Sequence, residues 1–148
     1  MKIEAWLAAR NEPHSLRGLA FHLWAAVVYV DSVLTWADVR YEGRLPHVSF
    51  AVAQHRGALA VLQKLAALSK DNPEAGVRFE SDSQVLIQEL KGDAAVQRDP
   101  KCDPLLDVSR GLVLWLEPVM TMRYCHFRDN AVVHEMISQY CRKHGVGI

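Results

Sequence analysis

The feature that most constrains the fold is an uninterrupted apolar run, Leu23–Val30, flanked by His22 and Asp31. As a helix the run spans only about 12 Å, whereas a membrane-spanning helix needs roughly 20 apolar residues. The run must therefore be buried inside a globular core. It also continues an apolar stripe at helical spacing, formed by Leu16, Leu19, Ala20, Leu23, Val27, Val30 and Leu34. This pattern predicts one buried helix that opens at Pro13 or Ser15 and ends near Leu34.

Strand patterns lie on both sides of this predicted helix. Lys2–Leu7 alternates apolar and polar residues, which predicts a half-buried strand. Val39–Glu42 and His47–Val52 alternate in the same way around a turn at Gly43, so a hairpin is expected there. The segment Gln54–Lys70 then has the spacing of a second helix, with Leu59, Leu62, Leu65 and Leu68 facing inward.

The second half of the chain predicts further strands and one last helix. Val77–Glu80 reads as a strand, and Val85–Leu90 as a strand or a helix. Lys91–Pro104 is expected to be a surface loop. Gly111–Glu117 is expected to be a strand with Met120–Phe127 as its hairpin partner, and a helix should run from Asn130 to Gly145. The predicted fold class is α+β: a mostly antiparallel sheet with about three helices in a two-layer sandwich, as one domain over residues 1–148.

Charge and cysteine content narrow the partners and the compartment. Lys+Arg and Asp+Glu number 17 each, so the formal net charge is zero, and a general attraction to phosphate backbones is not expected. Glu4 interrupts any early signal-peptide core. Cys102, Cys125 and Cys141 are odd in number and irregularly spaced, which favours free thiols in a reducing compartment. A cytoplasmic protein without nucleic-acid or membrane partners is expected.

The residues most able to carry chemistry lie near the C-terminus: Cys125, His126, His134, Glu135, Cys141 and His144. Their spacing does not match a zinc motif. Cys–His nucleophile pairs can be drawn from Cys125 with His134 or from Cys141 with His126, but no third orienting group is evident. We therefore expect no catalytic residue, no metal and no cofactor, and a chain that is not an enzyme.

Aromatic and acidic residues offer a binding surface instead. Trp24 and Trp115 lie in apolar segments and are expected in the core, whereas Trp6 lies on the face of its strand opposite Ile3. Six carboxylates gather in the middle of the chain: Asp71, Glu74, Glu80, Asp82, Glu89 and Asp93. They form either an ordinary solvated face or an acidic patch that meets a basic partner.

The first third of the chain resembles a known family. The segment Ile3–Trp6 is followed by Arg10, Glu12, Asp31 and finally Trp36. This series resembles the opening of immunity protein 52, a family of bacterial polymorphic-toxin immunity proteins. The resemblance covers residues 3–36. It implies an antitoxin that binds and occludes a cognate protein toxin, such as a nuclease delivered by type VI secretion, and it implies no catalytic residues.

The expected interface then consists of Trp6, Arg10 and Glu12 together with the six carboxylates. Two alternatives remain open. One is a secretion chaperone or adaptor that binds a protein without inhibiting it. The other is a small enzyme or metal-binding regulator built on the Cys/His residues. The sequence assigns no oligomeric state.

Overall fold

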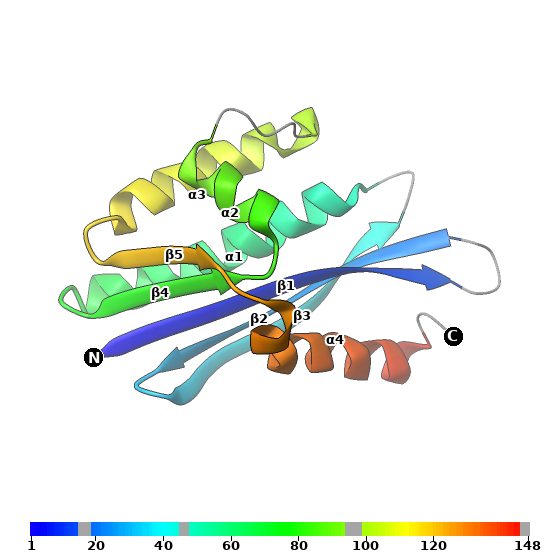
Figure 1. Ribbon diagram of the computed structural model, residues 1–148, viewed down its shortest axis with the longest axis horizontal. Helices are drawn as coiled ribbons and strands as arrows, with labels where there is room; N and C mark the ends of the chain where they lie inside the picture. The colour runs from blue at the N-terminus through cyan, green and yellow to red at the C-terminus, as the bar shows by residue number, and fades with distance from the viewer. Residues whose placement is uncertain (15–18, 45–47, 94–98, 146–148) are drawn as a thin grey trace.

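The computed structural model describes residues 1–14, 19–44, 48–93 and 99–145, and in them one sheet has the strand order β3-β2-β1-β4-β5 (Figure 1). The strands are β1 Lys2–His14, β2 Leu19–Val30, β3 Val33–Arg44, β4 Gly76–Ser81 and β5 Met120–Tyr124. The β1–β2 and β2–β3 pairs are antiparallel, and the β1–β4 and β4–β5 pairs are parallel. The α+β class is confirmed, but the sheet is mixed and not mostly antiparallel.

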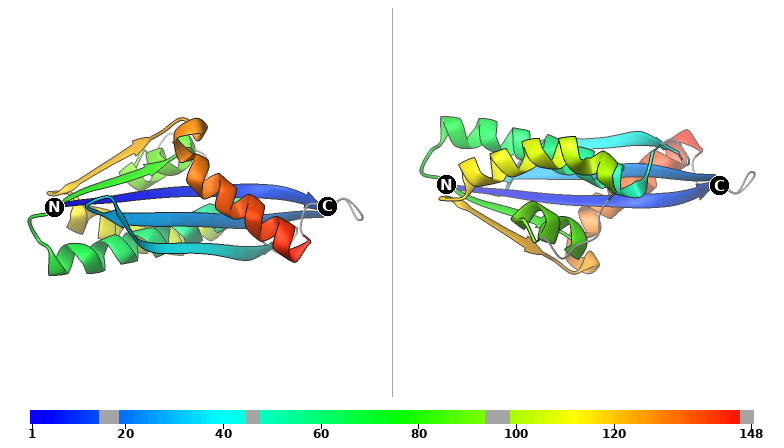
Figure 2. Two further views of the ribbon diagram at one scale, coloured as in Figure 1. Left: turned by 90° about the horizontal axis from the view of Figure 1, so that it is seen from below. Right: turned by 90° about the horizontal axis from the view of Figure 1, so that it is seen from above.

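Helices cover both faces of the sheet. The described residues form four α-helices: α1 Phe50–Asp71, α2 Gln84–Lys91, α3 Asp103–Leu116 and α4 Ala131–His144. The first three share one apolar core with the sheet, and α4 packs on the opposite face (Figure 2). The molecule therefore has three layers, where two layers and about three helices were predicted. None of the described helices is both long and apolar enough to span a bilayer.

The predicted first helix is wrong, because its apolar run forms the strand β2. Leu23, Ala25 and Val27 pack against α4, whereas the alternate residues Trp24, Ala26 and Val28 belong to the core beneath α1. A strand covered on both faces carries a continuous apolar run without alternation, and such a run does not distinguish strand from helix. Ser15 and Leu16 lie outside the described residues.

The strand β2 turns directly into β3. Asp31 and Ser32 have φ angles of +48° and +66°, which is the backbone of a tight two-residue hairpin. Val39–Glu42 is a strand, as predicted, but it belongs to β3 and not to a hairpin around Gly43. Of His47–Val52, His47 lies outside the described residues and Phe50 already begins α1.

The helix predicted over Gln54–Lys70 is confirmed as α1. The Ser49 side chain caps it by accepting a hydrogen bond from the Val52 N–H. Gly57 faces the sheet from this helix, close to Leu7 and Trp24. The missing side chain at Gly57 therefore sets how closely α1 approaches β1 and β2.

In the second half, the strand Val77–Glu80 is confirmed within β4, and Val85–Leu90 takes the helical option as part of α2. Lys91–Pro104 contains the end of α2 and the start of α3, and residues 94–98 are not described. The strand predicted over Gly111–Glu117 is wrong because the segment lies largely in α3.

The apolar run of α3 is amphipathic, so Leu116 is buried while Trp115 is 54% exposed and not in the core. Of the strand predicted over Met120–Phe127, Met120–Tyr124 forms β5, which pairs in parallel with β4 and makes no hairpin. The last helix is confirmed as α4, and Gly145 follows it with a φ of +69°.

A candidate site where β1 and β4 separate

The parallel strands β1 and β4 separate at their carboxyl ends. Their pairing runs from Lys2 opposite Gly76 to Leu7 opposite Ser81, where β4 ends while β1 continues to His14. The chain leaves β1 toward β2 on one side and returns through α1 to β4 on the other side. In open sheets, ligands bind in the crevice at such a switch point. We call this place the β1–β4 crevice, a name that denotes only the divergence of the two strands.

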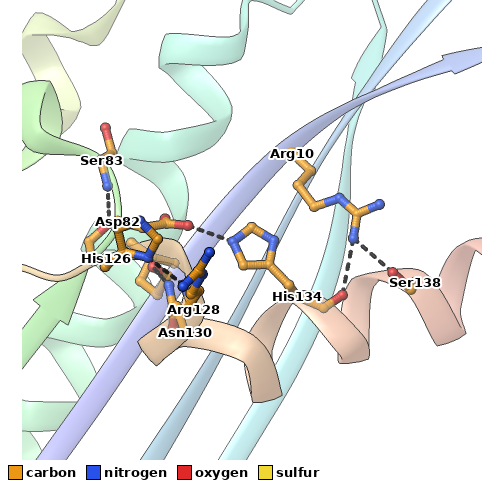
Figure 3. A network of polar contacts seen from close by, with 10 residues as sticks. Arg10, Asp82, Ser83, His126, Arg128, Asn130, His134 and Ser138 are labelled. Atoms are coloured by element: carbon orange, nitrogen blue, oxygen red, sulfur yellow. Dashed lines mark hydrogen bonds and ion pairs between the residues drawn. The ribbon is translucent and has the colours of Figure 1, made fainter.

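An acid–imidazole pair lies at the crevice (Figure 3). Asp82 directly follows β4, and Ser83 caps α2 by accepting a hydrogen bond from the Leu86 N–H. His134 comes from the first turns of α4, and its Nε2 lies 2.5 Å from Asp82 Oδ2. The two side chains are 14% and 19% exposed, so they are sheltered but reachable. With Nε2 bonded to Asp82, Nδ1 is the ring atom that can take or give a proton.

Two polar side chains hold α4 against β1 beside this pair. The Asn130 side chain donates from Nδ2 to the Leu7 carbonyl over 2.8 Å, at the last β1–β4 pair. Arg10 donates from Nη1 to the His134 carbonyl at 3.1 Å and to Ser138 Oγ at 2.8 Å (Figure 3). These bonds fix where His134 stands relative to the end of β4.

An exposed segment borders the crevice, and its side chains are aromatic or basic. It consists of Tyr124, His126, Phe127 and Arg128, which we call the cationic–aromatic rim. Tyr124 and Phe127 are 48% and 59% exposed. His126 Nδ1 accepts the Arg128 N–H at 3.1 Å, which leaves its Nε2 to carry the proton of the neutral ring. Phe127 meets His134 edge to face, with ring centroids 5.8 Å apart, so the rim and the Asp82–His134 pair form one surface.

The charges beside the crevice are partly neutralised. Glu80 is buried and lies between Arg78 and Arg123, and its hydrogen bond raises the pKa of the Arg123 guanidinium. Burial, together with the nearby carboxylates of Glu80 and Asp82, raises the pKa of the Cys125 thiol to about 11. Burial also raises the pKa of Cys141. Neither thiol is activated as a nucleophile, and His134 is paired with Asp82.

A metal centre does not fit the described residues. Within them, no group of three or more His, Cys, Asp or Glu side chains could hold a metal ion. Cys141 belongs to the core under α4, and His144 stacks on Tyr140 at 4.2 Å between ring centroids. Neither the metal-binding regulator nor the Cys-dependent enzyme has support from this arrangement.

The structure separates the residues that were expected to bind a partner. Arg10 and Glu12 form an ion pair on β1, and Trp6 lies half-buried against Tyr29. The six carboxylates do not form one exposed patch. Glu80 and Glu89 are buried, the latter 3.5 Å from His55. Among the others, Asp82 lies at the crevice, Asp71 and Glu74 lie at the amino end of β4, and Asp93 follows α2.

Sequence reasoning missed the Asp82–His134 pair. The two residues are 52 positions apart, so no local spacing links them. The usable signal was the position of Asp82, directly after a strand and before the capping residue Ser83. That position would have marked the carboxyl edge of the sheet as the place to look.

No family model matches the chain, and no curated protein matches it. Solved structures do match. LC11-RNase H1, isolated from compost by a metagenomic approach, has a TM-score of 0.71 at 15% identity and covers 90% of this chain and 91% of its own. The same protein in complex with an RNA/DNA hybrid gives 0.70 at 14%, covering 90% and 92%. RNase H1 from Halobacterium salinarum gives 0.63 at 18%, covering 91% and 93%. The chain therefore has the RNase H fold.

These likenesses correct the functional expectations. The matched structures are ribonucleases, so the immunity protein, its toxin partner and its link to type VI secretion were wrong, as was the expectation of no enzyme. The exclusion of nucleic acid was wrong as well, because LC11-RNase H1 binds an RNA/DNA hybrid on this fold. Net charge is a sum over the whole surface, whereas a single exposed cation such as Arg128 can still contact a phosphate.

Proposed function

We propose that this chain is a nucleic-acid-processing enzyme that binds RNA-containing nucleic acid across the β1–β4 crevice. The observation that carries the proposal is the Asp82–His134 pair at the switch point of a fold shared with an RNA/DNA-hybrid-binding ribonuclease. A ligand at this place would meet both the pair and the cationic–aromatic rim.

The rim has the chemistry that single strands and strand ends require. Exposed aromatic rings such as Tyr124 and Phe127 can stack on bases, and Arg128 can contact a phosphate. The Nε2–H of His126 adds a further donor beside the crevice. The 2′-hydroxyl is the group that distinguishes RNA from DNA at such a surface.

The Asp82–His134 pair supports proton transfer and not metal-assisted hydrolysis. Two-metal nucleases hold their ions roughly 4 Å apart with clustered ligands, and the described residues contain no such cluster. In the step that we propose, His134 Nδ1 takes the proton of an RNA 2′-hydroxyl. The 2′-oxygen then bonds to the adjacent phosphorus, the P–O5′ bond breaks, and the 5′-oxygen takes a proton from water, whose hydroxide is neutralised by the proton that His134 holds. The products are a 2′,3′-cyclic phosphate and a 5′-hydroxyl.

Binding is tested by fluorescence anisotropy with a labelled RNA/DNA hybrid and the DNA duplex of the same sequence. We expect the hybrid to bind at least about tenfold more tightly at the same salt concentration, because only the hybrid offers 2′-hydroxyls. Equal affinity for both duplexes, or no binding to either, would contradict the proposal.

Cleavage is tested separately, with the hybrid and with single-stranded RNA, in the presence of EDTA. We expect cleavage that persists without divalent metal and that falls about 100-fold or more in His134→Ala. Lys64→Ala, on α1, is the control for handling and contaminating nuclease. Cleavage that requires Mg²⁺, or that is equal in His134→Ala, would overturn the proton-transfer chemistry and leave binding to be judged by its own assay.

The proposal also includes the cytoplasm as the place of action and one domain over residues 1–148. Cys125 and Cys141 are buried free thiols, and Cys102 is buried as well, which fits a reducing compartment.

A further inference from the structure

A pocket of about 300 Å³ opens next to the N-terminal end of α4, on the face of the sheet that this helix covers. Strand β1, hairpin β2–β3 and the start of α4 all contribute to it. Its lining consists of Glu4, Trp6, Val27, Tyr29, Ser32, Asp129, Asn130, Val132 and Val133. The proposed reaction uses none of these side chains.

The walls of the pocket combine flat apolar surface with hydrogen-bond acceptors. Trp6 and Tyr29 meet edge to face at 5.6 Å between ring centroids, and Val132 and Val133 face them from α4. The carboxylate of Glu4 is bound by Arg78, whereas Asp129 is exposed. A ligand that fits these walls is flat, apolar on its faces and rich in donors on its edge.

One residue of the lining, Asn130, carries a buried acceptor without a partner among the described residues. Asn130 is 1% exposed, and its Nδ2 is used by the Leu7 carbonyl. Its Oδ1 is buried and has no hydrogen-bond partner in the described part of the chain. Buried polar atoms are nearly always satisfied, because an unpaired acceptor loses the hydrogen bonds that water would give it. The bond to Leu7 fixes the amide orientation, so Oδ1 remains the acceptor.

We propose that this pocket binds a nucleobase that carries an exocyclic amino group. The amino hydrogens would donate to Asn130 Oδ1 and to the Asp129 carboxylate, while the ring packs against Trp6 and Tyr29. A carboxylate that accepts from an amino group is a known way to read a base edge.

The pocket and the β1–β4 crevice both lie beside the N-terminal end of α4. Asn130 lies one turn before His134 and is bonded to Leu7 at the crevice (Figure 3). A strand lying across the crevice could therefore place one of its bases in the pocket. This extension to a strand rests on the proposed function, whereas the binding of a base does not.

The test is calorimetric titration with two nucleoside pairs that differ by one group. Cytidine carries an amino group where uridine has a carbonyl, and guanosine carries the 2-amino group that inosine lacks. We expect each amino-bearing nucleoside to bind at least roughly tenfold more tightly than its partner, as expected when a buried acceptor loses its donor. Equal affinities within both pairs, or no heat of binding with any nucleoside, would overturn the proposal that the pocket binds a nucleobase.

Two matched pairs of variants locate the binding. Asp129→Asn removes the charged acceptor and should weaken cytidine binding several-fold, whereas Asp107→Asn, on α3, should not. Val132→Trp should fill the pocket and abolish binding, whereas Val108→Trp, 53% exposed on α3 against 58% for Val132, should not. Nucleoside binding that survives both pocket variants would contradict the assignment, provided that circular dichroism shows them folded.

Two further titrations separate the possible sources of the ligand. An n-butylammonium ion mimics a lysine side chain of a protein partner. If this ion binds as tightly as cytidine, the assignment of a nucleobase as the ligand is overturned. Oligonucleotides test the proposed function alone. Nucleoside binding without oligonucleotide binding would uphold the pocket and contradict that function, and the reverse result would overturn the pocket.

Discussion

Gly57 marks the closest approach of α1 to the sheet, and it offers a sharp test of the packing that positions the crevice. A Cβ atom at Gly57 would lie 2.9 Å from Leu7 Cδ1 and 2.9 Å from Trp24 Cγ. Carbon atoms in contact prefer separations of about 3.5–4.0 Å. Leu7 and Trp24 are buried, so neither side chain can retreat into solvent. Because Leu7 also accepts the Asn130 hydrogen bond, strain here reaches the crevice.

The magnitude follows from two opposing effects. Overpacking a core costs about 1–3 kcal/mol, while replacing Gly by Ala inside a helix gains about 1 kcal/mol. Gly111 in α3 supplies the control, since a Cβ there would meet nothing within 4 Å. Gly111→Ala should therefore raise the free energy of unfolding by about 1 kcal/mol, through helix propensity alone. Gly57→Ala should lie about 1–3 kcal/mol below Gly111→Ala.

The assay is urea unfolding followed by circular dichroism. With a typical slope of 1–3 kcal/mol per molar urea, the midpoints of the two variants should differ by on the order of 1 M. If Gly57→Ala were as stabilising as Gly111→Ala, the close contact between α1 and the sheet would be refuted.

Three further predictions concern single side chains. Burial lowers the pKa of His22, so between its unfolded value near 6.5 and its lower folded value only the unfolded chain takes the proton. The free energy of unfolding should thus fall as the pH drops below about 6.5, and His22→Leu should reduce this loss when urea midpoints at pH 7.5 and 5.5 are compared. Cys125, with a pKa of about 11, should react with iodoacetamide slowly at pH 8 and faster at pH 10, as peptide mass spectrometry can measure; rapid labelling at pH 8 would contradict its burial. Ser83→Ala removes the cap of α2 and should cost about 1 kcal/mol by thermal unfolding, and an unchanged Tm would show that the cap is unimportant.

Sequence patterns predicted the elements that are exposed on one side. α1 and α4 each show one apolar face, and β1 alternates as a half-buried strand, so their local periodicity carries the information. Periodicity failed where burial does not follow it. β2 is covered on both faces, so its Leu23–Val30 run has no alternation and predicts a helix instead. The short apolar run at Gly111–Glu117 predicts a strand, although it lies in a helix of which only part faces the core.

The candidate site depended on contacts that a single sequence does not contain. Arg10, Asp82 and His134 come from β1, from the end of β4 and from α4, and only the strand order brings them together. The residues behind the immunity-protein resemblance have local structural roles as well. Asp31 forms the β2–β3 turn, and Arg10 fastens α4. A motif made of such residues therefore indicates a fold and does not identify a binding partner.

The central claim is that nucleic acid lies on the β1–β4 crevice, and the salt dependence of hybrid binding tests it most directly. The slope of log affinity against log salt concentration counts the phosphates that the protein neutralises. We predict that Arg128→Ala, on the rim, weakens hybrid binding and reduces this slope by about 1. Lys70→Ala, at the end of α1 beside the amino end of β4, should leave both unchanged. The opposite result, a reduced slope in Lys70→Ala and none in Arg128→Ala, would place the nucleic acid elsewhere and contradict the account.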